Sequence, residues 1–388
     1  MPVTESRAVE VLSDLVRIES VTPWLIPDGA GEGAVARHIA SWLADLDGVR
    51  VELEDAAPGR PNVIARLPGA GGGPALWLNA HEDTVGYANW RARALTPERA
   101  GDRLVGLGAA DDKSSCAIGM LAMRSLVERG VRLRGDLVLA CVADEEGASI
   151  GTEDLIRRHP MDATLVLEPE GLDRIVVEHQ GFGWIDVIVH GRAAHGSAPD
   201  VGIDAIARMA EVIRRLGELD RTGFGSGEGG LSGRTVFHTG TIGGGTDYAT
   251  YPARCVLGIE IGTQPGEHLS DRVREIEGIF ASLGRDDPDF RGEVVVQIDR
   301  DPFKAEGHEA LYEALARSAE RALGRTPTAA GVNGWGDSGL TQGAGIPTLS
   351  YGALGGNFHA PDEWVSIDEL VQGVGIVEDA IVEFCGEA

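Results

Sequence analysis

The chain has 388 residues, of which 43% are hydrophobic and 24% are charged, an ordinary composition for a globular protein. Its formal net charge of −27 argues against nucleic-acid binding, because contact with phosphates needs a basic face. There is no apolar run of about 18 residues to suggest a membrane span, and the N-terminus has no apolar signal-peptide core. The four cysteines are widely spaced, so we expect a cytoplasmic protein, and the length favours two domains.

The first 180 residues alternate between amphipathic and short apolar segments. Helical periodicity predicts helices at 5–18, 31–46, 115–129 and 151–158. Strands are predicted at VRVELE, NVIARL, ALWLNA, DLVLACVA and ATLVLE. This alternation predicts an α/β domain with a mixed, largely parallel sheet.

Side chains that suit metals stand at the ends of three of these predicted strands. They are His81 in LNAHEDTV, Glu146 in ADEEG and Glu168 in LVLEPE. Ligand sites in open α/β sheets form at the carboxyl ends of strands, so we expect these three at one edge. Asp111 in GAADDK and His359 in GNFHAPDEW complete a set of two imidazoles and three carboxylates. Five ligands fit two divalent ions that share one carboxylate, with zinc favoured and cobalt or manganese also suited.

Each motif taken alone also has an ordinary structural explanation. His81 with Asp83 could be a surface pair, Asp111 could cap a helix, and Glu168 could form a salt bridge. The three acids of DEEG could be an exposed turn, and His359 could be a hydrogen-bonded loop residue. The metal hypothesis therefore rests on the combination of five signals rather than on any one of them.

The chemistry of the same motifs suggests roles for three further residues. In DEEG, Glu146 would bind metal while its neighbour Glu145 stays free as the general base. Asp83 lies two residues after His81, where it could hold the second ring nitrogen of the ligand histidine. His195 in GRAAHGSAPD is interpreted as a donor to the developing oxyanion, with an ordinary surface histidine as the alternative.

The pattern changes after about residue 180. Strands are predicted at 182–190, 234–242, 254–261 and 292–299, and helices at 202–218 and 268–284. This β-α-β-β-α-β order predicts a ferredoxin-like α+β domain inserted into the first domain. The expected division is a catalytic domain at 1–179 and 303–388 with an inserted domain at 180–302.

Two features complete the expected organisation. The Gly- and Ser-rich segment 221–233 is expected to be a mobile loop. The returning catalytic domain should contain a helix at 308–323, the apolar segment PTLSYG and a last helix at 366–385.

Together these motifs resemble the zinc peptidase and deacylase family that includes acetylornithine deacetylase, succinyl-diaminopimelate desuccinylase, aminoacylase and glutamate carboxypeptidase. The resemblance covers almost the whole chain, including GDSGL and GIPTLSYG before His359. It implies that Asp111 bridges two metal ions, that His81 and Glu168 complete one site, and that Glu146 and His359 complete the other.

The resemblance also implies an activity and an assembly. Metal-activated water would cleave an amide bond of an N-acyl amino acid or a related small amide, with Glu145 as general base and Asp83 orienting His81. The inserted domain resembles the family's lid and dimerisation domain, which implies a homodimer. His195 resembles a histidine that reaches the active site of the partner subunit.

The chain departs from the family pattern in this inserted domain. Ala249 stands at the place of a family Asn, and Gly262 stands at the place of an Arg that grips the substrate's α-carboxylate. Arg254 lies eight strand residues away, about 26 Å, and cannot substitute directly. We therefore expect recognition of an α-carboxylate to be altered or absent.

Other functions remain open at this stage. A dipeptidase or carboxypeptidase of the same family is the main alternative, and Asp247 is the acid that could hold a substrate amine. AAHGS and GDSGL also invite a remote comparison with serine hydrolases of the chymotrypsin type. A catalytically inactive homologue would have lost a ligand or the base, and none is lost here.

Overall fold

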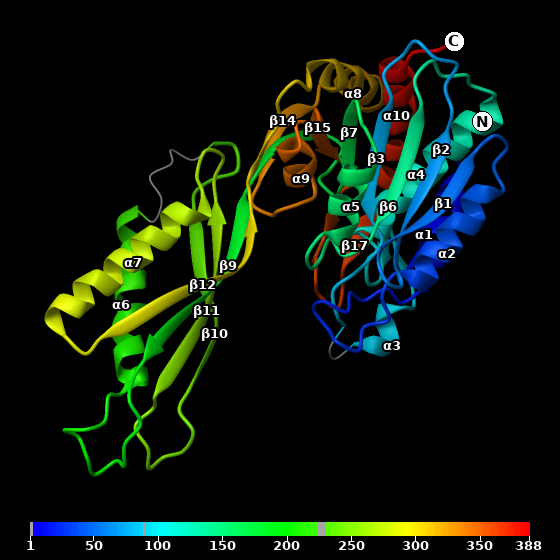
Figure 1. Cartoon of the computed structure of the whole chain (residues 1–388). Coiled ribbons are helices and arrows are strands. Elements are labelled where there is room, and N and C mark those ends of the chain that lie inside the picture. The colour runs from blue at the N-terminus through cyan, green and yellow to red at the C-terminus, as the bar shows by residue number, and fades with distance from the viewer. Residues whose placement is uncertain (1–2, 88–89, 224–229) are drawn as a thin grey trace. The chain divides into compact units, whose positions relative to one another are not determined.

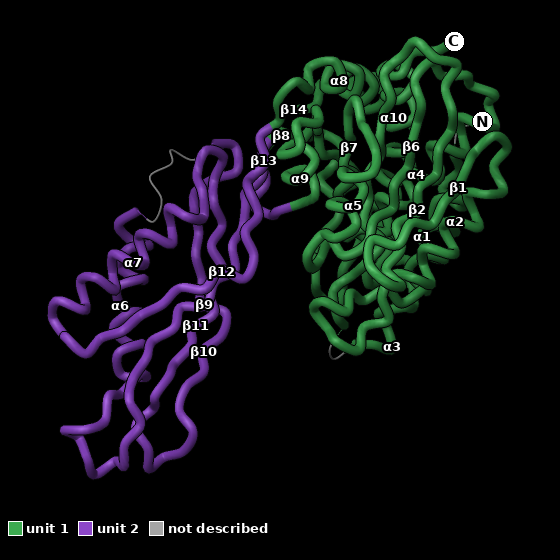
Figure 2. Tube along the Cα trace, viewed as in Figure 1, with its two compact units in different colours: residues 1–177, 305–330, 336–388 green, residues 178–304, 331–335 purple. Residues whose placement is uncertain are grey.

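The computed structural model describes residues 3–87, 90–223 and 230–388 (Figure 1). The chain forms two compact units (Figure 2). Unit 1 comprises Met1–Val177, Ala305–Ala330 and Gly336–Ala388, and unit 2 comprises Glu178–Lys304 and Gly331–Trp335. The segment 180–302 that the sequence assigns to an inserted domain lies within unit 2. Residues 224–229 of the loop expected to be mobile lie outside the described residues.

The largest sheet is mixed, and most of its strands belong to unit 1. Its order is β1-β2-β6-β3-β7-β15-β8-β13, and β14 pairs with β8. The central strands β6, β3, β7 and β15 are parallel, whereas the outer pairings are antiparallel. The strands are β1 (Arg50–Ala57), β2 (Arg60–Leu67), β3 (Leu76–His81), β6 (Leu137–Val142), β7 (Ala163–Leu167), β8 (Arg174–His179), β13 (Phe303–Lys304), β14 (Thr328–Val332) and β15 (Thr348–Tyr351). The expected α/β fold with a largely parallel central sheet is confirmed.

Helices pack beside this sheet, and those of 12 residues or more form the main core of unit 1 with it. The helices of unit 1 are α1 (Glu5–Val16), α2 (Gly33–Ala44), α3 (Arg91–Ala94), α4 (Lys113–Arg129), α5 (Ile150–Arg158), α8 (Glu309–Leu323), α9 (Ser338–Gly343) and α10 (Ile367–Cys385). Most of α4 is buried, and it packs closely on the sheet at Gly119, where an added Cβ would lie 2.6 Å from the Leu139 side chain. This close packing fixes the start of α4, which follows Asp111, against the central strands.

A second, small sheet in unit 1 was not predicted from the sequence. It consists of β4 (Glu98–Ala100), β5 (Arg103–Val105), β16 (Gly355–Gly356) and β17 (Trp364–Ser366). Strands of two or three residues are too short to show a periodic pattern, which explains why they were missed. The loop that carries His359 connects β16 and β17, which pair with each other, and β17 also pairs with β5.

Unit 2 is a four-stranded antiparallel sheet with two helices, in the order β10-β11-β9-β12. Its elements are β9 (Gly181–His190), α6 (Ala205–Gly223), β10 (Val236–Gly244), β11 (Arg254–Thr263), α7 (Leu269–Asp286) and β12 (Arg291–Arg300). Alternate residues of β9 and β11, such as Val187 and Leu257, form a core with α6 and α7. The chain order and sheet order confirm the ferredoxin-like prediction.

The fold bears on two further points of the sequence analysis, the chymotrypsin-like alternative and the membrane span. The chymotrypsin-like interpretation is wrong, because that fold is all-β and this one has a helix-flanked, largely parallel sheet. Among the described residues, no helix is both long enough and apolar enough to cross a bilayer.

Candidate metal centre

Three neighbouring parallel strands bring polar side chains to one edge of the main sheet. His81 is the last residue of β3 and pairs in register with Val142, the last residue of β6. Glu145 and Glu146 follow β6 after two intervening residues, and Glu168 directly follows β7. The expectation that these segments meet at the carboxyl ends of the strands is met by the topology.

Asp111 comes from a loop that Glu363 holds in place. The Glu363 carboxylate accepts hydrogen bonds from the backbone N–H groups of Gly108, Ala110 and Asp111 at 3.1, 2.9 and 3.0 Å. Glu363 is almost fully buried and lies four residues after His359. One side chain therefore ties the Asp111 loop to the His359 loop.

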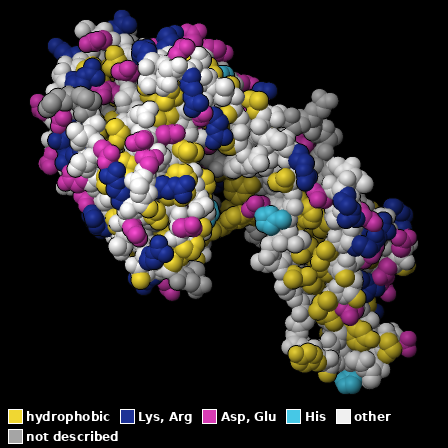
Figure 3. Space-filling model, turned by 180° about the vertical axis from the view of Figure 1, so that it is seen from behind, with side chains coloured by type: hydrophobic (Ala, Val, Ile, Leu, Met, Phe, Trp, Pro, Cys, Tyr) yellow, Lys and Arg dark blue, Asp and Glu magenta, His cyan; other side chains and the backbone are white. Residues whose placement is uncertain are grey.

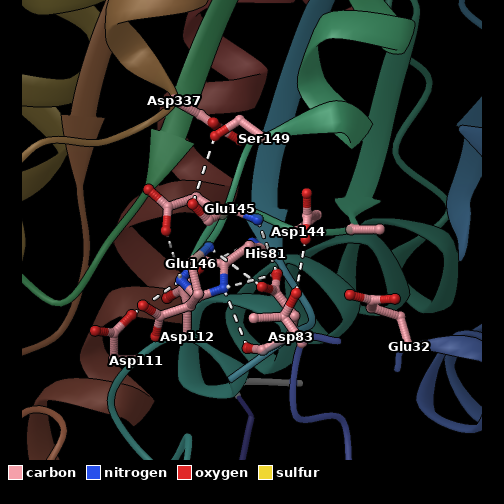
Figure 4. Close-up of polar contacts among 12 residues, drawn as sticks. Glu32, His81, Asp83, Asp111, Asp112, Asp144, Glu145, Glu146, Ser149 and Asp337 are labelled. Atoms are coloured by element: carbon pink, nitrogen blue, oxygen red, sulfur yellow. Dashed lines mark hydrogen bonds and ion pairs between the residues drawn. The ribbon is translucent and has the colours of Figure 1, made fainter. Parts of the chain in front are cut away.

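The Asp111 carboxylate lies between the two histidines. Its Oδ1 is 2.9 Å from Nε2 of His81, and its Oδ2 is 3.4 Å from Nε2 of His359. Nε2 of His359 is also 3.2 Å from Oε2 of Glu146. Figure 4 shows Asp111, Glu146 and His81 facing one another.

The potential ligand atoms form two groups that share Asp111. His81, Asp111 and Glu168 form one group, and Asp111, Glu146 and His359 form the other, with ligand atoms in each within 4.8 Å of one another. The donor set of imidazole and carboxylate suits divalent ions such as zinc. Oε1 of Glu146 is buried and has no hydrogen-bond partner among the described residues, which also fits a site for a cation.

Asp83 connects the histidine to the acidic turn. Nδ1 of His81 lies 3.2 Å from the carbonyl oxygen of Asp83 and 3.4 Å from its Oδ1, which leaves Nε2 directed at Asp111. The Asp83 carboxylate also accepts hydrogen bonds from the backbone N–H groups of Glu145 and Glu146, at 3.0 and 3.2 Å. Asp83 can therefore orient His81 and at the same time hold the turn that carries the expected base.

Asp112 contacts the backbone rather than the ligand groups. Its Oδ2 accepts a hydrogen bond from the backbone N–H of His81 at 3.1 Å. Asp111, by contrast, contacts the rings of both His81 and His359.

Buried negative charge dominates the electrostatics of the centre. Burial raises the pKa values of Glu145, Glu146 and Glu168 above the usual carboxyl range. Burial would also raise the pKa of Asp111, but its hydrogen bonds with His359 and His81 lower it. The contacts with Asp111 and Glu146 raise the pKa of His359 to about 11. Clustered buried carboxylates are costly unless protons or cations balance them.

His195 lies in a different unit from the other predicted site residues. It is exposed, in the loop after β9 rather than at the strand end, and its Nδ1 is 2.8 Å from Oγ of Ser197. A backbone bridge pairs it with Thr250, next to Ala249. The oxyanion role of His195 stays a prediction.

Sequence reasoning missed two buried acids of this region, Glu363 and Asp337. Asp337 accepts a hydrogen bond from Thr152, and burial raises its pKa to about 6. Figure 4 places it beside Ser149 and Glu145. Both acids stand in motifs that were noticed, PDEW and GDSGL, but their backbone and hydroxyl partners are far away in the chain.

Comparison with known proteins identifies the family. The family described as Peptidase family M20/M25/M40 matches residues 77–383, most of the chain and all five potential ligands. The chain belongs to this family. As an M20 protein it is a hydrolase that acts on carbon–nitrogen amide bonds, and the family predicted from the motifs is confirmed.

Individual M20 proteins resemble the chain along most of its length. It is 28% identical to an N-formyl-4-amino-5-aminomethyl-2-methylpyrimidine deformylase of Bacillus subtilis, over 92% of this chain and 91% of that protein. It is 28% identical to an acetylornithine deacetylase of Myxococcus xanthus, over 86% and 87%. The crystal structure of aminopeptidase PepT from Bacillus cereus has the same fold, with a TM-score of 0.80, 24% identity and coverage of 99% and 100%.

Proposed function

We propose that the protein is a two-metal amidohydrolase that cleaves a small N-acyl amide. The observation that carries this proposal is the Asp111 carboxylate, whose two oxygens face the two histidines of separate ligand groups. His81 and Glu168 would hold one ion with it, and Glu146 and His359 the other. Zinc suits these ligands best, and cobalt or manganese would also fit.

The chain's own side chains supply the proton transfers. Bound divalent ions would polarise the amide carbonyl and lower the pKa of water. Glu145 accepts the proton of the attacking water and delivers it to the leaving nitrogen. Its Oε2 lies 3.8 Å from Nε2 of His81, beside the ligands without belonging to either group of three. His195 is assigned the role of hydrogen-bond donor to the tetrahedral oxyanion.

The surroundings of Gly262 support a substrate without an α-carboxylate. This position, where the family resemblance puts a carboxylate-gripping Arg, is buried in β11. A Cβ added there would lie 2.5 Å from Oε1 of Gln180 and 2.9 Å from Cγ2 of Val236. Gln180 is itself fixed by hydrogen bonds to the carbonyl oxygens of Ser232 and Arg234. The side chain of Gln180 thus fills the space into which residue 262 would extend.

The related deformylase points to the same class of substrate. Its name describes an N-formyl group on an aminomethylpyrimidine, a molecule that has no carboxylic acid. We therefore propose that the substrates are N-formyl or N-acetyl amides of amines that carry no carboxylate, rather than N-acyl amino acids.

A matched pair of substrates tests this assignment. N-acetylphenylalanine and N-acetylphenethylamine differ only in the carboxylate, and the zinc- or cobalt-loaded enzyme should have at least a tenfold higher kcat/KM for the second, about 1.4 kcal/mol. N-formylbenzylamine and a set of dipeptides complete the panel, and a chelator should abolish every activity. Faster turnover of N-acetylphenylalanine would contradict the substrate class, and preference for dipeptides would establish the alternative function. Full activity of metal-free protein would refute the metal mechanism.

We also propose a cytoplasmic homodimer that assembles through unit 2. Val236, Ile242 and Val296 of this unit are large apolar side chains that stay exposed in the single chain. On the face seen in Figure 3, hydrophobic side chains extend along the unit 2 part of the molecule. The four cysteines are buried free thiols, which supports a reducing compartment that cell fractionation would check.

A further inference from the structure

A buried cluster of charged residues lies behind the acidic turn of the metal centre. Arg60, the first residue of β2, donates hydrogen bonds to both carboxylate oxygens of Glu32. Its Nη2 also donates to Oδ1 of Asp144 at 2.8 Å and to Oγ1 of Thr22 at 3.1 Å. The Arg60 side chain is 15% exposed, while those of Glu32 and Asp144 are 0% and 1% exposed. This guanidinium therefore connects three separate segments of the chain below the surface.

Asp144 is the first acid of the turn and has an unusual backbone conformation. Its φ of 71° lies in the left-handed region, which residues other than Gly, Asn and Asp rarely adopt. The conformation persists because its side chain is held on several sides: Thr22 Oγ1 donates to Oδ1 at 2.6 Å, and the backbone N–H of Ala148 donates to Oδ2 at 3.1 Å. Its carbonyl oxygen accepts from the backbone N–H of Ser149 at 2.6 Å.

The geometry of Asp144 decides where the next two side chains point. Glu145 and Glu146 follow it directly, and Figure 4 shows Asp144 and Glu32 on one side of this turn and Asp111 on the other. The Asp83 carboxylate accepts hydrogen bonds from the two backbone N–H groups. Arg60 donates to the side chain of Asp144. A carboxylate thus holds the backbone of the turn, and a guanidinium holds its first side chain.

Charge adds to this geometric argument. Asp144 is buried, its neighbours Glu145 and Glu146 are partly buried, and three consecutive acids in such a place repel one another. In the part of the chain that the structure describes, Arg60 is the Lys or Arg side chain that forms an ion pair with this segment. Its planar fork can serve Glu32 and Asp144 together, which a lysine ammonium cannot reproduce.

Strand β2 contacts the far end of the same segment through Asn62. The Asn62 amide donates to the carbonyl oxygen of Gly151 at 2.9 Å and accepts from the backbone N–H of Ala143 at 3.1 Å. Two side chains of one strand therefore hold the segment from Ala143 to Gly151 on both sides of the turn.

We propose that Arg60 is a positioning residue for Glu145 and Glu146: through Asp144 it fixes the turn that presents the general base and one metal ligand. This inference rests on the metal centre proposed above. It predicts that loss of Arg60 weakens the ion held by Glu146 and His359 more than the ion held by His81 and Glu168.

Titration with Co²⁺, monitored by calorimetry and by visible absorption, tests this selectivity without a substrate. Wild-type protein should bind two ions. Arg60→Gln should bind one of them about 10–100-fold more weakly, with an altered absorption band, and the other within about threefold, as for loss of a residue that supports a ligand. The affinity of Arg60→Lys for the weakened ion should lie between those of wild type and Arg60→Gln. In the double variant Arg60→Gln/Asp144→Asn, the two losses should be less than additive, because both act on one contact.

A matched control separates positioning from general stability. Arg272 of unit 2 is also a buried Arg paired with two acids, Glu267 and Glu275. Arg272→Gln should lower the melting temperature but leave both Co²⁺ affinities unchanged.

The possible outcomes separate failure of the proposed metal centre from failure of the role proposed for Arg60. Wild-type protein that binds no Co²⁺ would refute the metal centre itself. The role of Arg60 alone would be refuted if wild-type protein binds two ions and folded Arg60→Gln binds both with the wild-type affinities. The same conclusion would follow if Arg272→Gln weakened Co²⁺ binding as much as Arg60→Gln does. If Arg60→Gln does not fold, Arg60→Lys decides, and unchanged affinities in that variant would refute the inference.

Discussion

At the scale of single residues, Glu145 and Glu146 differ in their contacts, which is the basis for the different roles proposed for them. The two are neighbours in sequence, yet Glu146 contacts His359 and belongs to a ligand group, whereas Glu145 does not. Burial raises the pKa of Glu145, which brings a carboxylate closer to the range where it can accept and return a proton near neutral pH.

Replacement of Glu145 should separate metal binding from turnover. Glu145→Gln keeps the size of the side chain but cannot take a proton, so we expect about a 10²–10⁴-fold loss of kcat with both metals retained. Steady-state kinetics and metal analysis of the same sample measure the two effects. Glu145→Asp retains a carboxylate and should recover part of the rate. Near-normal turnover by Glu145→Gln would remove Glu145 from the mechanism.

Sequence reasoning found the residues whose chemistry is marked by their local context. His81, Glu146 and Glu168 stand at the ends of apolar strands, where a cluster of polar side chains is expected to be functional. Arg60 and Glu363 carry no such mark, because their partners are remote in the sequence: Asp144 is 84 residues from Arg60, and the Asp111 loop is about 250 residues from Glu363. Contacts of that kind exist only once the chain has folded.

At the scale of elements, periodicity predicted the long helices and most of the buried strands, whereas the short strands were not predicted. The helix expected at 366–385 is α10 (Ile367–Cys385), where Ser366 caps the first turn by accepting from the backbone N–H of Glu369. Strand β8 (Arg174–His179) was missed, although its alternation is partly apolar. It pairs with β13, β14 and β15, which are remote in the sequence, so only tertiary pairing defines it.

The end of α10 gives a test based on pH. Burial raises the pKa of the Cys385 thiol to about 12, from an ordinary value of 9.0. Above pH 9 the unfolded chain loses this proton while the folded protein keeps it, so the contribution to stability is complete below pH 9 and declines as pH rises towards 12. Urea unfolding of wild type and Cys385→Ala from pH 7 to 10.5 should show the wild type losing more stability with pH. Parallel curves would contradict this account.

At the scale of the whole molecule, the proposal of a dimer rests on exposed apolar side chains of unit 2. Strand β10 is an edge strand of its sheet, and Ile242 on it is 60% exposed. Exposed apolar side chains on an open edge strand favour pairing with another chain.

A charged substitution on this edge tests the dimer. Light scattering should give twice the chain mass of 40.9 kDa for wild type, and Ile242→Lys should shift the protein towards monomer because a lysine opposes edge pairing. Leu53→Lys, at a similarly exposed apolar residue of unit 1, should leave the mass unchanged. A wild-type monomer, or a dimer indifferent to Ile242→Lys, would contradict assembly through β10.

The wide spacing of the ligand residues has a consequence for biosynthesis. The first of them is residue 81 and the last is residue 359, so the ribosome must have synthesised His359 before both ligand groups can be complete. Nascent or prematurely terminated chains would lack His359 and, with it, the ligand set for a second ion. Hydrolytic activity that depends on both ions would therefore appear only in chains that extend past His359.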